Sequence, residues 1–152
     1  MKSSYLKIFY IPPVLTTYCV VAMYFLRRYL PAYNLLPYPY NYAGFLFVLI
    51  GLIIMVSTVY LFRKHKTTLE WKTSRTLLKT GFYKYSRNPI YIGLAFLIFG
   101  LSVYSRNVLA LPLVGLFLVA LRFGVIRIEE RMLAATFGKE YLQYMIDVRR
   151  WL

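Results

Sequence analysis

The residues best suited to chemistry stand where a basic loop meets an apolar run. Arg87, Asn88 and Pro89 follow one another immediately before that run. Asn is a favoured helix cap and Pro is favoured at the first helical position, so these residues predict the start of a helix. A helix start exposes free backbone N–H groups and a partial positive charge, and Arg87 adds a full one. Such a place suits an anion, but the same residues fit equally well a plain cap with an arginine that only sets topology.

A second chemical feature is the pair of adjacent acids Glu129 and Glu130, in a stretch expected to continue the last apolar run as a helix. Adjacent helical residues point about 100° apart, so the two carboxylates cannot serve one ligand in the same way. One can bind a ligand while the other pairs with a base such as Arg127, Arg131 or Arg87. Two acids in a strongly basic protein are otherwise interpreted as solvated ion-pair partners, worth about 0–1 kcal/mol each.

A bilayer is the solvent that the composition indicates for the elements around these residues. The chain has 152 residues, 60% hydrophobic and 19% aromatic, which is too apolar for an ordinary soluble domain of this size. A membrane-crossing helix needs about 20 apolar residues. The apolar runs lie at residues 8–26, 42–62, 89–104 and 108–126, and the third is the shortest. We predict a single all-α domain over residues 1–152, a polytopic membrane helical bundle of about four transmembrane helices with an uncleaved first span.

Charge placement predicts which side of the membrane holds the chemistry. Of the 19 Lys and Arg residues, only Arg27, Arg28 and Arg106 fall in the connections after the first and third spans. The positive-inside rule therefore places both termini, the loop of residues 63–88 and the segment of residues 127–152 in the cytoplasm. The five acids fall on the same side. We expect a multi-pass protein, of the plasma membrane if the organism is prokaryotic.

The remaining composition excludes several classes of function. The net charge of +14 is explained by topology and by attraction to membrane lipids, worth about 1 kcal/mol per basic residue near an anionic surface. No nucleic-acid motif accompanies it, so no nucleic-acid partner is expected. His65 is the one histidine and Cys19 the one cysteine, so the sequence predicts no metal site. It also contains no phosphate-binding loop, hydrolase elbow or HExxH element.

Glycines and a proline predict how the later helices are arranged. Residues 105–107 are too few for anything except a tight hairpin between the third and fourth spans. Gly100 and Gly115 are expected to let these two helices approach closely. Pro112 is expected to bend the fourth span near its outer end, and Gly138 to interrupt the helix that carries the acids.

Three pieces of sequence, taken in order, resemble a known family. They are the run G-F-Y-K-Y-S-R-N-P-I-Y-I-G at residues 81–93, the pair Glu129–Glu130, and the tail F-G-K-E-Y-L-Q-Y at residues 137–144 with V-R-R-W-L at residues 148–152. Together they resemble the isoprenylcysteine carboxyl methyltransferase and phospholipid methyltransferase group of integral membrane enzymes. The resemblance implies methyl transfer from S-adenosylmethionine at the cytoplasmic edge of a helical bundle. It also implies a cofactor pocket between the loop before the third span and the C-terminal segment.

The resemblance further implies which residues surround the cofactor. Arg87 is expected to hold an anionic group and Glu130 to bind the cofactor, and catalysis is expected to depend on these two. The family often has His at the position of Asn88, and Asn does not titrate near neutral pH, so no acid–base role is expected there. The full set of expected cofactor-binding residues is Gly81, Tyr83, Arg87, Asn88, Pro89, Tyr91, Gly93, Glu129 and Glu130.

The expected methyl acceptor is lipophilic and enters from the bilayer. It would be an isoprenylcysteine-type carboxylate, a phospholipid amine or a related small molecule. Two other functions stay open. Steroid-reductase-like membrane enzymes that use NADPH have a similar Arg-(His/Asn)-Pro-x-Tyr-x-Gly pattern, although this chain has Leu94 where they tend to have an acid. A non-catalytic membrane adaptor would bind neither cofactor.

Overall fold

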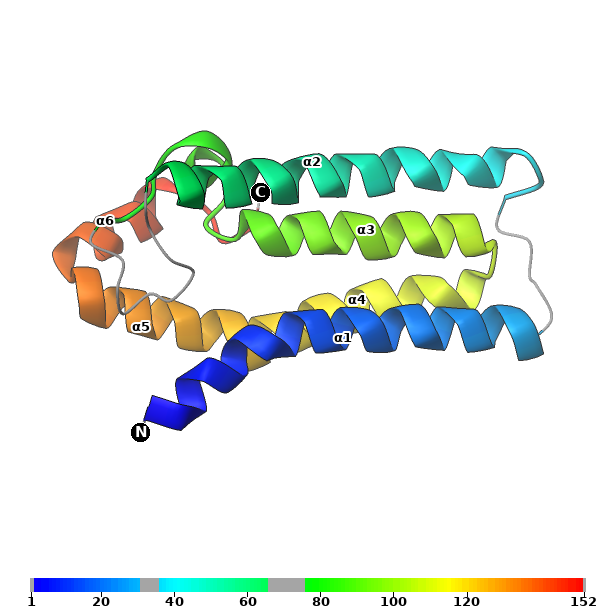
Figure 1. Ribbon diagram of the computed structural model, residues 1–152, viewed down its shortest axis with the longest axis horizontal. Helices are drawn as coiled ribbons and strands as arrows, with labels where there is room; N and C mark the ends of the chain where they lie inside the picture. The colour runs from blue at the N-terminus through cyan, green and yellow to red at the C-terminus, as the bar shows by residue number, and fades with distance from the viewer. Residues whose placement is uncertain (1, 31–35, 66–75, 152) are drawn as a thin grey trace.

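The computed structural model describes residues 2–30, 36–65 and 76–151, and the regular secondary structure in these ranges is entirely helical. Helices α1, α2, α3 and the α4–α5 run lie along the long axis of the molecule (Figure 1). In chain order the elements are α1 (Lys2–Tyr29), η1 (Tyr40–Tyr42), α2 (Ala43–Lys64), η2 (Gly81–Lys84), α3 (Pro89–Ser105), η3 (Val108–Ala110), α4 (Leu111–Leu121), η4 (Arg122–Ile126), α5 (Arg127–Phe137) and α6 (Lys139–Asp147).

The polar segments gather at one end of the bundle. Figure 1 shows α6, the far end of α5 and the residues that lead into α3 together at that end, whereas the α3–α4 hairpin lies at the other. The loop before α3 and the helix that carries the acids are thus brought together from distant parts of the sequence, as predicted.

The fourth predicted span and the acid-bearing helix form one helical run. It begins with α4, passes through the π-helical turn η4 and continues as α5 to Phe137. Gly138 follows with a φ of +54°, which confirms that this glycine interrupts the helix. Pro112 lies in the first turn of α4, where a missing N–H removes no helical hydrogen bond. The predicted bend at Pro112 is therefore wrong, because this proline helps to start the helix.

Two helical stretches among the described residues are long and apolar enough to cross a membrane, Tyr40–Lys64 and Val108–Phe137. Helix α3 is apolar but shorter, at 17 residues. Large apolar side chains on the outer faces of the long stretches are exposed, among them Val56 and Leu116. Apolar surface of this extent suits lipid better than water. The two apolar helical stretches of spanning length and their exposed apolar side chains indicate a membrane protein.

Helices α2 and α3 pack through facing glycines. A Cβ placed on Gly51 would lie 2.5 Å from the carbonyl oxygen of Gly93, and one on Gly44 would lie 2.4 Å from that of Gly100. Real Cβ atoms do not approach that closely, so only glycine allows this backbone separation. The predicted partner of Gly100 is wrong, since Gly100 faces α2 and no atom of the described residues lies within 4 Å of a Cβ placed on Gly115.

The hairpin end of the bundle is held by a fully buried Asn107. Its Nδ2 donates to the carbonyl oxygen of Leu26 at 3.0 Å, and its Oδ1 accepts from the backbone N of Leu109 at 2.9 Å. Arg106, just before it, adopts the left-handed conformation with a φ of +63° and ends α3. The short connection is a tight turn, as predicted, and it also fastens α1 to the other helices.

A Gly51→Ala substitution tests the α2–α3 contact. The added methyl group would overlap the α3 backbone, so we expect a loss of about 1–3 kcal/mol in the free energy of unfolding, the usual cost of overpacking. The measurement is the thermal unfolding midpoint of the detergent-solubilised protein. Gly115→Ala is the matched control, because its Cβ would contact no described residue. Equal midpoints for the two variants would contradict the packing described here.

Candidate functional site

The loop before α3 is fixed by a glycine and by two buried tyrosines. Gly81 has a φ of +61° and opens the short helix η2, a conformation that favours glycine. Tyr83, two residues on, is buried. Its carbonyl oxygen accepts a 2.7 Å hydrogen bond from the hydroxyl of Tyr144 on α6. The loop is therefore held against the C-terminal helix.

The start of α3 is as predicted, but Asn88 acts differently. Pro89 takes the first turn of the helix, whereas the Asn88 side chain makes no capping hydrogen bond. Its Nδ2 donates instead to the carbonyl oxygen of Arg150 at 3.1 Å. Ser86 accepts from the backbone N of Asn88 at 3.0 Å and donates to the same carbonyl at 3.1 Å. The predicted side-chain cap is wrong because a backbone carbonyl from the C-terminal segment takes the Asn88 donor.

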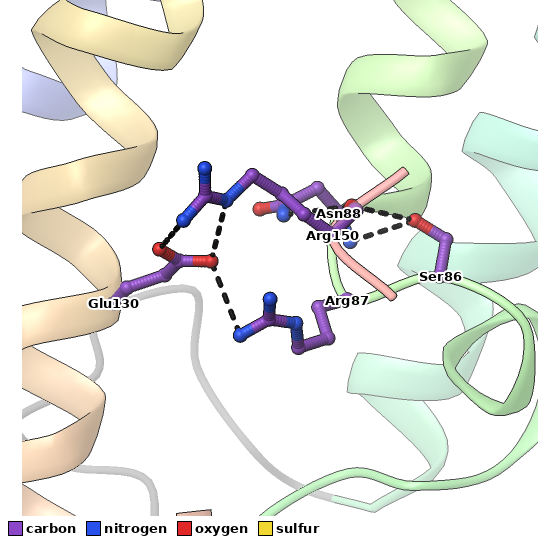
Figure 2. Close-up of polar contacts among 5 residues, drawn as sticks. All are labelled: Ser86, Arg87, Asn88, Glu130 and Arg150. Carbon is purple, nitrogen blue, oxygen red and sulfur yellow. Dashed lines mark hydrogen bonds and ion pairs between the residues drawn. The ribbon is translucent and has the colours of Figure 1, made fainter. Parts of the chain in front are cut away.

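The two acids are buried and have different partners. Glu129 and Glu130 are only 5% and 8% exposed, so they are not solvated surface groups. Glu129 Oε1 accepts a 2.7 Å hydrogen bond from the hydroxyl of Tyr91 on α3. Glu130 lies between two guanidiniums, with Arg87 Nη1 at 3.3 Å from Oε1 and Arg150 Nη2 at 2.7 Å from Oε2 (Figure 2). Glu130 therefore pairs with bases, one of them the expected Arg87, while Glu129 has a tyrosine partner.

Arg150 is one of the residues at the site that sequence reasoning did not assign to it; Tyr141, which lines the cavity described below, is another. Arg150 comes from the segment after α6 and reaches Glu130 with two donors, Nε at 2.9 Å and Nη2 at 2.7 Å. The available signal was the V-R-R-W-L tail. The sequence does not show which of the two adjacent arginines points toward the site. Only the directions of their side chains in the structure distinguish them. Arg149 is exposed, whereas Arg150 turns inward.

A cavity of about 430 Å³ opens beside these residues. Six of the nine expected residues line it. They are Tyr83, Arg87, Asn88, Tyr91, Glu129 and Glu130. The other three lie outside the lining: Gly81 forms the turn, Pro89 starts α3, and Gly93 packs against α2. Their positions support the site indirectly, by shaping the backbone around it.

The cavity has a polar part and an apolar part. The polar part comes from the loop before α3, from α5 and from Tyr141 on α6. The apolar part comes from the long helices of the bundle and includes Pro12 and Pro13 of α1, Met55 of α2 and Leu94 of α3. A ligand there would have one end among charges and the other against hydrocarbon.

Arg87 has unused hydrogen-bonding capacity. Its side chain is 9% exposed, and Nη1 lies at ion-pair distance from Glu130 without hydrogen-bond geometry. Nε is buried and has no hydrogen-bond partner among the described residues. Leaving buried donors unpaired is costly, so Arg87 has capacity for a further acceptor group.

The tyrosines of the polar part stay protonated at neutral pH. Burial raises the pKa of Tyr83, and the nearby charge of Glu129 raises it further. Burial also raises the pKa of Tyr141 to about 12, with Glu130 raising it and Arg87 lowering it. Both groups can therefore donate hydrogen bonds but are poorly suited to accept a proton as bases.

The fold and the site define a class of protein before any comparison is made: a helical membrane protein with buried acids lining a cavity at one end of its bundle. The comparison with protein families makes the class specific. The family model described as phospholipid methyltransferase matches residues 40–140, which include α2, α3 and both acids. The chain belongs to the phospholipid methyltransferase family.

A curated relative is similar over part of the chain. It is the protein-S-isoprenylcysteine O-methyltransferase of Saccharomyces cerevisiae, 31% identical over 80 residues. The aligned region covers 53% of this chain and 34% of the relative, so the chain spans only about a third of that protein's length. No solved structure matches the chain.

Substitutions of Asn88 test its role as an anchor for the C-terminal segment. Asn88→Ala removes one donor, but the Arg150 carbonyl still accepts from Ser86. Asn88→Asp places a carboxylate against that carbonyl, so we expect the larger loss, about 1–3 kcal/mol for an unsatisfied buried group. Thermal unfolding midpoints should rank wild type above Ala and Ala above Asp. An Asp variant as stable as wild type would rule out the anchor.

Proposed function

We propose that the protein transfers a methyl group from S-adenosylmethionine to a lipophilic acceptor at the cytoplasmic face of a membrane. The observation that carries the proposal is the unused donor capacity of buried Arg87 in a cavity that also contains the buried acid Glu129. Membership of the phospholipid methyltransferase family and similarity to the yeast relative support the same class of reaction.

The residues present fit the groups that this cofactor carries. S-adenosylmethionine has a carboxylate, an ammonium, a sulfonium and an adenine ring. Arg87 offers donors for the carboxylate, and Glu129 offers negative charge for the cationic groups. Tyr83, Tyr91 and Tyr141 bring aromatic rings to the same lining. The volume of about 430 Å³ lies within the usual range for ligand pockets, about 300–1,000 Å³.

In this proposal Glu130 has a different role from Glu129 in binding the cofactor. Both of its carboxylate oxygens contact guanidiniums. It lines the cavity, as expected for a cofactor-binding residue, but its charge is largely engaged by Arg87 and Arg150. Glu130 therefore acts on the cofactor mainly by holding Arg87 in place.

The chemistry requires alignment more than proton transfer. The bound cofactor supplies an activated methyl group. The chain's residues orient the two reactants and keep water out, which can supply much of the rate enhancement of an in-line displacement. Asn88 cannot act as a base, and Tyr83 and Tyr141 are protonated. An acceptor that arrives already nucleophilic, such as a carboxylate or a thiolate, suits this set of residues best.

The surrounding helices suit an acceptor that comes from the bilayer. In the proposed topology α1, α2, α3 and the α4 run cross the membrane, with both termini and the charged end of the bundle in the cytoplasm. The apolar wall formed by Pro12, Met55 and Leu94 would then meet the hydrocarbon portion of a lipophilic substrate, while its reactive group reaches the charges.

Arg87→Gln tests the cofactor site. We expect the dissociation constant for S-adenosylhomocysteine, measured by calorimetry in detergent, to rise about tenfold or more, because a charge-assisted hydrogen bond is lost. Arg131→Gln is the matched control: Arg131 also belongs to the charged end and loses the same charge, but its residue is exposed. Unaltered affinity in Arg87→Gln, or equal losses in both variants, would contradict the assignment.

Thermal shift with S-adenosylhomocysteine and with NADPH separates the proposed function from a reductase and an adaptor. Stabilisation by the first ligand alone is expected, because the several phosphates of NADPH would face Glu129 and Glu130. Stabilisation by NADPH alone would indicate a reductase, and by neither an adaptor.

A screen of methyl acceptors with labelled donor tests the substrate class. Prenylcysteine and phospholipid acceptors in detergent or vesicles should be turned over, and short water-soluble analogues with the same reactive group should react poorly, because they leave the apolar wall uncovered. Equal turnover of the short analogues would argue against a lipophilic acceptor.

A further inference from the structure

Glu130 is held more closely by Arg150 than by Arg87. Arg150 makes two hydrogen bonds to the carboxylate, at 2.9 and 2.7 Å, whereas Arg87 makes one ion-pair contact at 3.3 Å. The two Arg150 bonds reach different oxygens of the carboxylate, the paired arrangement that gives arginine–carboxylate contacts their strength. Figure 2 shows both guanidiniums directed toward Glu130.

The backbone of the same segment holds the loop before α3. The carbonyl oxygen of Arg150 accepts from Ser86 Oγ and Asn88 Nδ2, each at 3.1 Å. The carbonyl oxygen of Arg149 accepts from the backbone N of Arg87 at 3.0 Å. Arg150 thus contacts α5 through its side chain and the loop through its carbonyl.

This arrangement has a consequence for Arg87. A carboxylate that paired with Arg87 in the two-bond manner would occupy the donors that a ligand needs. Because Arg150 takes both oxygens of Glu130, Arg87 Nε is left without a hydrogen-bond partner among the described residues, in the wall of the cavity. Without Arg150, Glu130 would be free to turn toward Arg87 and compete with an anionic ligand.

We infer that Arg150 is a positioning residue of the cofactor site, which holds Glu130 so that Arg87 keeps its donors for the anionic group of the methyl donor. The inference rests on the proposed function. It assigns a role in the site to the segment after α6 and separates the two adjacent arginines, one of which acts on the site while the other faces outward.

Arg150→Gln and Arg150→Lys test this role. The Gln variant should raise both the dissociation constant for S-adenosylhomocysteine and the KM for S-adenosylmethionine about tenfold or more, with kcat largely kept, because binding is lost rather than transition-state stabilisation. Lys keeps the charge but cannot make the paired contact, so its effect should lie between Gln and wild type. The measurements are calorimetry and labelled-methyl turnover on the full chain in detergent.

Two controls separate positioning from general effects. Arg149→Gln removes the same charge from the neighbouring, exposed side chain and keeps the backbone carbonyl, so affinity should be unchanged. Gly138→Ala strains the backbone at a φ of +54° between α5 and α6, at a residue that is not part of the cavity lining. It should lower the unfolding midpoint and leave affinity unchanged. If Arg150→Gln fails to fold, the test uses Arg150→Lys instead. Its affinity for S-adenosylhomocysteine is then compared with that of Gly138→Ala.

Three results would overturn the inference. They are wild-type affinity in the Arg150 variants, an equal loss of affinity in Arg149→Gln, and an equal loss in Gly138→Ala at the same fall in midpoint. Failure of the proposed function has a different signature, since the unmodified protein itself would not bind S-adenosylhomocysteine. Binding by wild type with no effect at Arg150 would overturn the positioning role alone.

Discussion

The site depends on the buried carboxylate of Glu130, which lies between two guanidiniums. Such a charge is costly to bury unless it is paired and hydrogen-bonded. Here Arg87 and Arg150 surround it, and Glu129 adds a second negative charge nearby, bound by Tyr91. The two guanidiniums and two carboxylates balance in formal charge. These contacts bring together the loop before α3, helix α5 and the C-terminal segment.

The long helices of the bundle make this meeting possible by setting where α3 begins. The close contact of Gly51 with Gly93 and of Gly44 with Gly100 fixes α3 against α2. At the hairpin end, buried Asn107 ties α1 to the turn before α4. The helices therefore hold the polar residues at one end and supply the apolar wall beside them. The proposed function needs both, since a lipophilic acceptor must bring its reactive group to the charges while its chain stays in hydrocarbon.

Asn88 limits the chemistry that its position can do. A histidine at this position could exchange a proton near neutral pH, whereas Asn88 donates to the Arg150 carbonyl. The neighbouring tyrosines have raised pKa values and do not replace that function. The position serves here to attach the C-terminal segment. The chemistry proposed for the cavity is accordingly one of alignment and charge. No residue needs to remove a proton if the acceptor arrives already deprotonated.

The sequence by itself determined the helical, apolar character of the chain, the helix start at Pro89, the break at Gly138 and the family, because local rules and ordered motifs govern these features. It also indicated six residues that line the cavity. Only the tertiary structure decided that Gly100 faces α2 rather than α4, that Asn88 binds a distant carbonyl, and that Arg150 rather than Arg149 holds Glu130. These depend on the direction of side chains brought together across the fold, and residue type and spacing do not specify direction.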